Sequence, residues 1–294
     1  MAEFMEALFS IFFIETLING LLLGGVLALL SLGLNLIFGV VDVVWICYAE
    51  IIMLGMYTIY FLVKAGVPLP LAVIGGIAVS TILGYLTHKL VISRVLDAAP
   101  INQLLATGGL LFFFQGAAMV AFGIEFRNLG VSLGSLAVSQ DIYLSWTRLL
   151  SFAISGVVVI ALYFFLSRSY LGAAIRAISQ DREIMTLMGV DTKRLYLLTS
   201  AIGGALAGLA AALLALQYDV HPFIGLSFGP ITFVICVMGG LGNMVGGFLA
   251  AFVFAELITI GGYFAELEWG YVMAFVFFVV TMFIRPEGLF ARKS

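Results

Sequence analysis

One carboxylic acid lies alone in a long apolar stretch, and it is the first group in this sequence that could hold or move a charged solute. Glu50 is the only charged residue within 43–63. A charge inside hydrocarbon is costly, so such a residue is a functional candidate by default. On a continuous helix, one face would carry four residues at i+4 and i+7 spacing: Asp42, Ile46, Glu50 and Tyr57. This face either lines a polar path or lets Glu50 accept hydrogen bonds from a neighbouring helix end.

Other polar residues within apolar stretches belong to the same group of candidates. In a membrane they either line a path or join helices through hydrogen bonds, each worth about 1 kcal/mol. Gln115 and Glu256 are weaker candidates of this kind. We expect Tyr218, Asp219 and His221 at the outer end of a helix. There they either meet a solute or a delivery protein, or only anchor the helix at the membrane interface. The candidates for the lining of a translocation path are Asn35, Asp42, Tyr48, Glu50, Tyr57 and Asn243.

The sequence carries no recognisable catalytic or metal-binding pattern. It contains no GxxxxGK[ST] loop, so ATP is not expected to bind here in the usual way. His88 and His221 are far apart, and Cys47 and Cys236 each lie in an apolar segment, which argues against a metal site or a disulfide. The net charge of -3 offers no basic surface to nucleic acid. We therefore expect no enzyme activity, no cofactor, no metal and no nucleic-acid partner.

The composition indicates which elements position these residues. Hydrophobic residues make up 63% of the 294, charged residues only 10%, and the mean hydropathy is +1.21. A soluble domain carries about 25% charged residues, so this chain belongs in a lipid bilayer. We predict an all-α polytopic transmembrane bundle of about eight segments, forming one domain over 1–294. The expected spans are 11–38, 42–63, 67–90, 101–123, 147–167, 195–217 and 269–285, with a helix pair in 229–262.

Lysine and arginine predict the orientation of the bundle. Ten of the 13 basic residues fall in the segment 88–102, the segment 168–196 and the C-terminal tail. Basic residues favour the cytoplasmic side of a membrane. We therefore expect a multi-pass protein in the plasma membrane of a prokaryote, or the inner membrane of a Gram-negative cell. Its N-terminus would lie outside and its C-terminus in the cytoplasm.

Glycines predict a break in the stretch 229–262. Residues 239–247 read GGLGNMVGG, and so many glycines disfavour a continuous helix. We read the stretch as two shorter helices that enter and leave on the outer side, with a glycine-kinked single span as the alternative. Transporters place such breaks near the solute path. A similar break at 39–45 hints at an internal repeat of two halves, 1–123 and 147–294.

Small residues predict close helix packing in another part of the chain. The run 203–215 consists largely of Gly and Ala. Small side chains let helix backbones approach each other in a membrane. We therefore expect this helix to be packed on several sides.

The loop 168–194 is the longest polar stretch of the chain. Its pattern predicts one or two short amphipathic helices over 172–188, a helix end at Gly189 and an N-cap at Asp191. Such a helix docks in the groove of a partner protein or lies flat on the membrane, and periodicity does not separate the two.

Four stretches together resemble the permeases of branched-chain amino acid ABC transporters. They are 33–39 (GLNLIFG), the loop 172–190, the glycine-rich 237–247, and 285–290 (RPEGLF). They occur in the family's order and span nearly the whole chain. By this resemblance the loop is a coupling helix that seats in an ATPase, and its expected contact residues are Gly172, Arg176, Ala177, Asp181, Arg182, Leu187 and Gly189.

The resemblance implies a membrane-spanning subunit of an ATP-driven importer without its own ATPase site. Its expected partners are two cytoplasmic ATP-binding subunits, a second related permease or a second copy, an outer solute-binding protein and the bilayer. The expected solute is a branched-chain or other hydrophobic amino acid. Residues 45–50 (WICYAE) depart from the family's Asn-Phe-Ala-His-Gly-Glu pattern and match only at Glu50. Urea, short amides and aromatic acids therefore remain alternatives, and an ion-coupled secondary transporter is a more distant one.

Overall fold

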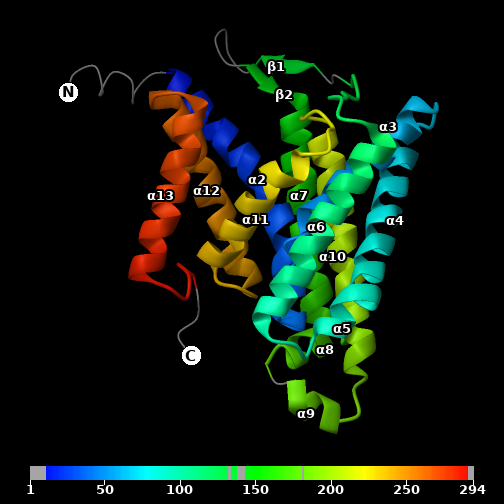
Figure 1. The fold of residues 1–294 in the computed structure, drawn as a ribbon. Helices are drawn as coiled ribbons and strands as arrows, with labels where there is room; N and C mark the ends of the chain where they lie inside the picture. Colours follow the sequence, from blue (N-terminus) through cyan, green and yellow to red (C-terminus); the bar gives the residue numbers. More distant parts are fainter. Residues whose placement is uncertain (1–10, 132–133, 138–142, 181, 291–294) are drawn as a thin grey trace.

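The computed structural model describes residues 11–131, 134–137, 143–180 and 182–290, and it shows a bundle of long apolar helices (Figure 1). Within the described residues, six helices are long and apolar enough to cross a membrane: α2 (Ile11–Val41), α4 (Leu69–Thr87, whose span continues to Val95), α6 (Pro100–Phe122), α7 (Trp146–Arg168), α10 (Thr192–Ala215) and α12 (Met244–Phe264). The shorter elements are α3 (Tyr48–Lys64), the π-helix η1 (His88–Ile92), α5 (Ser93–Val95), α8 (Tyr170–Ile178), α9 (Arg182–Leu187), α11 (Ile224–Gly239) and α13 (Leu267–Ile284). The predicted polytopic helical bundle is confirmed at this level.

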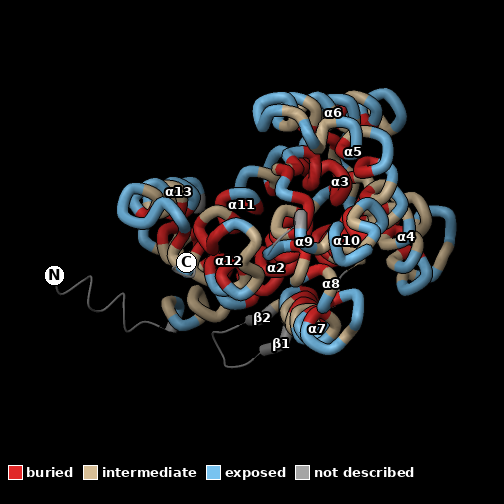
Figure 2. The backbone as a smooth tube through the Cα atoms, turned by 90° about the horizontal axis from the view of Figure 1, so that it is seen from below, coloured by how far each residue is buried: buried red, intermediate tan, exposed pale blue. Residues whose placement is uncertain are grey.

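The helices are arranged around two central ones. α2 and α10 pack against each other, and α2 also packs closely on α12. α11, α12 and α13 form one side of the molecule, and α3, α4 and α6 form the other (Figure 1). Viewed along the bundle, buried backbone lies at α2, α10 and α12, whereas α4, α6 and α13 turn exposed residues outward (Figure 2). The exposed residues are mostly apolar, as a lipid-facing surface requires.

Glycines allow a close contact between α4 and α10. A Cβ atom on Gly204 would lie 3.2 Å from the Cα of Gly84, and one on Gly84 would lie 2.6 Å from the carbonyl oxygen of Ser200. Most of the residues 203–215 are buried. The expected packing of this helix on several sides is confirmed.

The predicted break after the first span is also present. α2 ends at Val41, and α3 begins only at Tyr48. Asp42 is the one described non-glycine residue with positive φ, at 58°, a left-handed conformation that ends helices. The expected span 42–63 therefore starts six residues late. The expected face shared by Asp42 and Glu50 does not exist, because no helix connects them.

The stretch 229–262 is divided into two helices, as the glycines indicated. The turn between α11 and α12 contains Gly240 and Gly242, whose φ values of 96° and 79° are open mainly to glycine. Only α11 is short, with 16 residues; α12 has 21 and the length of a full span. That the pair enters and leaves on the outer side stays a prediction.

A short hairpin adds strands to the expected all-helical fold. β1 (Ser135–Ala137) pairs antiparallel with β2 (Tyr143–Ser145), in the register Ser135 with Ser145. Arg127, in the connection that also contains the hairpin, forms a β-bridge with Val220, and the two N–H···O distances are 3.0 and 2.7 Å. This bridge joins the α6–α7 connection to the α10–α11 loop at one end of the bundle.

Candidate functional site

A cavity of about 370 Å³ lies between the break after α2 and the helix α11. Its walls come from α2, the segment 44–46, α3, α6 and α11. Tyr48 and Thr232 are the lining residues with hydroxyl groups, and Trp45 adds an indole. The remaining walls are formed by glycine and by apolar residues, among them Leu34, Val44, Ile46, Leu104, Leu111, Leu226 and Phe233. This composition suits the aliphatic part of a small solute.

Glu50 is buried completely behind the wall of this cavity. Neither of its carboxylate oxygens has a hydrogen-bond partner within the described residues. The carboxyl group lies against Gly225 in the first turn of α11, where an added Cβ would overlap it. Glu50, the only charged residue in its apolar stretch, therefore carries a carboxylate that has no hydrogen-bond partner among the described residues. Such a group in a packed interior requires an explanation.

Side chains from two neighbouring helices hold the irregular segment 42–47. The hydroxyl of Thr107 on α6 lies 3.0 Å from the carbonyl oxygen of Val44. The indole of Trp45 is buried beside the ring of His88 at the start of η1, with centroids 6.4 Å apart. His88 in turn exchanges a hydrogen bond of 2.9 Å with Ser200 on α10. Buried backbone outside a helix needs such partners.

Three of the four motif stretches meet at one point beside the α11–α12 turn. Asn35 accepts a hydrogen bond from the backbone N–H of Gly242 at 3.2 Å. The side-chain amide of Asn243 donates to the carbonyl oxygen of Phe290 at 2.7 Å, and its oxygen accepts from the N–H of Gly246 at 3.0 Å. Asn243 is thus the N-cap of α12 and a tether for the C-terminal segment. The prediction that it lines a path gains no support from these contacts.

The other path candidates occupy separate environments. Asp42 is exposed at the end of α2. Tyr48 lines the cavity, and its hydroxyl donates to the carbonyl oxygen of Gly203 at 3.4 Å. Tyr57 is buried within aromatic residues and stacks on Phe122 with centroids 4.4 Å apart. The structure therefore places Tyr48 in the lining of the cavity and Glu50 behind its wall, and leaves Asp42 and Tyr57 away from the lining.

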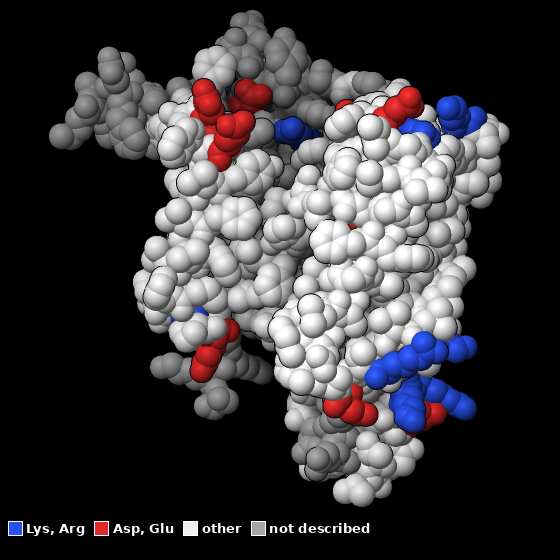
Figure 3. All heavy atoms as spheres, in the orientation of Figure 1, with Lys and Arg blue, Asp and Glu red and all other residues white. Residues whose placement is uncertain are grey.

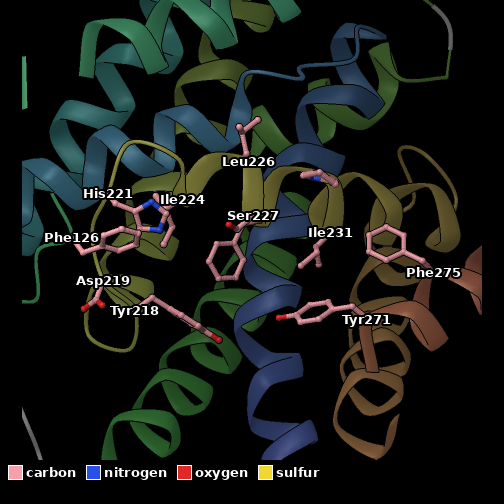
Figure 4. Close-up of a pocket in the computed structure, with 12 residues that line it drawn as sticks. Phe126, Tyr218, Asp219, His221, Ile224, Leu226, Ser227, Ile231, Tyr271 and Phe275 are labelled. Carbon is pink, nitrogen blue, oxygen red and sulfur yellow. The ribbon is translucent and has the colours of Figure 1, made fainter. Parts of the chain in front are cut away.

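A second, more open pocket of about 600 Å³ lies at the start of α11. Tyr218 and Tyr271 point toward each other across it, and the rings of Phe126 and His221 pack in a tilted arrangement at its rim with centroids 4.4 Å apart (Figure 4). Asp219 at the rim accepts a hydrogen bond of 2.7 Å from Asn128. Both pockets are lined by Leu226 and Pro230. The two spaces thus lie on different faces of α11 and share the edge formed by Leu226 and Pro230.

The loop between α7 and α10 forms two short helices, α8 and α9, as predicted. Ser169 caps α8 by accepting from the N–H of Gly172, which packs so closely on α7 that a Cβ would lie 2.5 Å from the Cα of Leu166. Gly189 ends α9 with φ 81°, and Asp191 caps α10 by accepting from the N–H of Arg194 at 3.1 Å. Asp181 lies outside the described residues.

The outer surface of this loop is exposed and partly apolar. Leu187 is 87% exposed and Met188 74% exposed. Arg176 is exposed in the last turn of α8, Ala177 is half-buried, and Arg182 begins α9. Lys and Arg side chains gather at this end of the molecule, and a wide band without charges separates them from the opposite end (Figure 3). α8 and α9 therefore project from the more basic end.

Sequence reasoning missed several residues that shape the site. Thr107, Trp45 and His88 support the break, but their roles depend on helices that meet only in the fold. Gly225 lacked any signal, since a single glycine at a helix start is common. Within the described residues, no group of three or more His, Cys, Asp or Glu is placed to hold a metal.

Comparison with known proteins gives one family for most of the chain. Residues 16–282 match the sequence model described as the permease component of the branched-chain amino acid transport system. The match covers every candidate residue of the cavity and of the α8–α9 loop. It begins inside α2 and ends near the end of α13.

Individual relatives agree over nearly the full length. The chain is 27% identical to the high-affinity branched-chain amino acid transport system permease protein BraD of Pseudomonas aeruginosa, over 96% of this chain and 97% of that protein. It is 25% identical to the corresponding permease protein LivM of Escherichia coli, over 89% of this chain and 67% of that protein. A solved structure of PsaBC from Streptococcus pneumoniae in complex with Fab has a similar fold, with a TM-score of 0.54 at 14% identity, over 97% and 96% of the two chains.

Proposed function

This chain belongs to the family of branched-chain amino acid transport system permease components, and we propose that it forms the membrane path of an ATP-driven importer of hydrophobic amino acids. The chain is a transport subunit, and ATP would be hydrolysed in two partner subunits on the cytoplasmic side. An outer binding protein would deliver the solute. Similarity to both BraD and LivM supports pairing with a second, related permease.

The observation that best supports the ATP-driven class is the projecting loop of α8 and α9. It presents exposed apolar side chains, Leu187 and Met188, at the end where basic residues gather. Basic residues favour the cytoplasmic side, so this end would face the ATPases. The N-terminus would then lie outside and the C-terminus inside. An exposed apolar tip on a short rigid helix is suited to a groove in a partner protein.

The path is proposed to run past α11, where Leu226 and Pro230 border both pockets. The outer pocket with Tyr218 and His221 would receive the solute, and the cavity beside Tyr48 would hold it at the break. Irregular backbone deep in a membrane protein is tolerated where it is buried or lines a path, and transporters place their solute sites at such breaks.

The docking role is tested by co-purification with the ATPases after expression of the whole transporter. Leu187→Asp and Arg176→Glu should each reduce the recovered ATPase at least about 10-fold. Changing a side chain that becomes buried at the interface with the ATPase removes several kcal/mol of binding free energy. Arg94→Glu is the matched control, because Arg94 is also basic and exposed at this end, but on α5. It should leave recovery unchanged.

If both loop variants recovered the ATPase normally and transported normally, the loop would be an interfacial helix and the docking role would be lost. Transport of leucine by the purified chain alone, driven by a proton gradient without ATPases, would instead establish the secondary-transporter alternative. Uptake of urea, short amides or aromatic acids in preference to leucine would change the solute class and keep the ATP-driven mechanism.

A further inference from the structure

The unsatisfied carboxylate of Glu50 defines the chemistry of a ligand. A carboxylate accepts hydrogen bonds and donates none, so its natural complement is a cation with several N–H donors. Within the described residues, no hydrogen bond or ion pair reaches either oxygen. Leaving such a group buried and unpaired is costly. A bound ammonium group would supply the missing partners.

The residues next to Glu50 border the cavity. Its chain neighbour Ala49 lines the cavity, and so does Gly225, against which the carboxyl group lies. Because Gly225 has no side chain, no side-chain atom of this residue covers the carboxyl group. Gly225 also lies in the first turn of a short helix that follows an irregular loop. A small displacement at this turn would expose the carboxylate to a solute in the cavity.

The cavity sets the shape of the rest of the ligand. Its volume of about 370 Å³ is at the lower end of the range for small-molecule sites. Leu34, Val44, Leu111 and Phe233 supply apolar walls without a charged side chain. A short aliphatic group fits these walls. The ligand therefore combines one ammonium group with one aliphatic chain.

We propose that Glu50 and the apolar cavity beside it form one solute site, in which the carboxylate binds a primary ammonium and the cavity holds an aliphatic side chain. The inference rests on the proposed transport function and narrows its solute class. It selects amino acids and aliphatic amines over urea, uncharged amides and acids that lack an amine, because a carboxylate attracts only the first group.

The test measures direct binding to the complete transporter in lipid nanodiscs, without the outer binding protein. Saturation-transfer NMR would compare leucine, 3-methylbutylamine and 4-methylpentanoate, which share an aliphatic chain and differ in their charged groups. Leucine and the amine should bind, and the acid should bind at least about 10-fold more weakly, the factor expected for one charge-assisted hydrogen bond. Equal binding of the acid and the amine would overturn the proposal, and this comparison needs no variant.

Two matched variants locate the effect. Glu50→Gln keeps the shape and removes the charge, and it should weaken binding of the amine about 10-fold or more. Glu256→Gln is the control, because Glu256 is also an intramembrane acid with an unsatisfied oxygen. It lies on α12, beside Gly20 of α2. It should bind as the wild type does.

The outcomes separate this inference from the proposed function. If the wild-type transporter imports leucine with ATP and Glu50→Gln binds and imports it equally well, the ammonium site is wrong and the transport function stands. If Glu50→Gln only lowers the unfolding temperature, the acid merely complements the N-terminus of α11. If the complete wild-type transporter neither binds nor imports leucine or the amine, the proposed function fails as well.

Discussion

At residue scale, the absence of a side chain at Gly225 leaves room for the carboxyl group of Glu50. An added Cβ at Gly225 would overlap the carboxyl group, whereas one at Gly229, a turn later on the same helix, would lie 3.4 Å from the Cβ of Ala49, an ordinary contact. Gly225→Ala should therefore displace the acid and destabilise the fold by about 1–3 kcal/mol. Gly229→Ala should be tolerated.

Thermal unfolding of both variants in the same detergent checks this prediction. A lower midpoint for Gly225→Ala alone is the expected result. Equal midpoints for the two variants would mean that the carboxyl group can move aside without strain, and that Gly225 is not required beside it.

His221, in the loop before α11, gives a prediction for pH. Burial lowers the pKa of His221, and the nearby Asp219 partly opposes this effect. A depressed pKa means that the folded state favours the neutral ring. The resulting stabilisation is present above the ordinary histidine pKa of about 6.5 and is lost as the pH falls below it.

The neutral variant His221→Gln serves as the reference for this pH effect. The difference in unfolding temperature between wild type and variant should shrink, or change sign, from pH 7.5 to pH 5.5. A difference that stays constant or grows in favour of the wild type would show that the folded protein does not disfavour the charged ring.

At residue scale, composition alone was sufficient to single out Glu50, which the structure buries, and its role stays a prediction. Glu50 was found because it is the only charge in its stretch. Asp42 was wrongly placed on the same helical face, because a left-handed residue at the end of α2 is invisible to a periodicity argument. Asn243 was grouped with the path residues, since a polar residue in an apolar segment looks the same whether it lines a path or caps a helix.

At element scale, the contact of α4 with α10 depends on glycines at the crossing. Gly204→Ala should force the two backbones apart and lower the stability by about 1–3 kcal/mol, since a Cβ there would lie 3.2 Å from the Cα of Gly84. Gly156 on α7 is the matched control, because nothing lies within 4 Å of its Cβ position.

Gly156→Ala should leave the unfolding temperature unchanged or raise it, because alanine favours the helix over glycine by about 1 kcal/mol. The measurement is the midpoint of thermal unfolding in detergent for both variants. A decrease of equal size in both would point to a general effect of glycine replacement and not to this crossing.

The turn between α11 and α12 gives another prediction at this scale. Asn243→Ser keeps a capping oxygen for α12 but is too short to reach the carbonyl of Phe290, and it should cost about 1 kcal/mol. Asn243→Ala loses the cap as well, which should cost about 1 kcal/mol more. The unfolding temperatures should fall in the order wild type, Ser, Ala, and equal values for Ser and Ala would remove the capping role.

The elements themselves were largely predictable, because runs of apolar residues and breaking glycines dictate where membrane helices start and end. α8 and α9, the cap at Asp191 and the division of 229–262 all followed from local pattern. The hairpin β1–β2 was missed because strands of three residues carry too little pattern. The π-helix that begins at His88 was missed because an apolar run does not show whether its turns are α or π.

At the scale of the whole molecule, the orientation in the membrane is the main prediction left to test. Cys47 and Cys236 are both fully buried, so they should react poorly with a membrane-impermeant maleimide. Leu187→Cys, on the projecting loop, should be labelled only from the cytoplasmic side. Ala65→Cys, exposed after α3 at the other end, should be labelled only from outside. The reverse pattern would invert the proposed topology.

The burial of α2 also constrains how the protein is made. α2 is the first of the described helices to leave the ribosome, yet its closest neighbours, α10 and α12, are synthesised about 150 to 250 residues later. Until then Asn35 lacks its partner Gly242, and Gly20 and Gly24 lack their neighbours on α12. We expect a nascent chain that stops before Thr192 to keep α2 cross-linked to the insertion machinery, and its release to follow only after Phe264 has emerged. The helices that surround α2 would thus pack against it only late in synthesis, although α2 is the first described helix to be made.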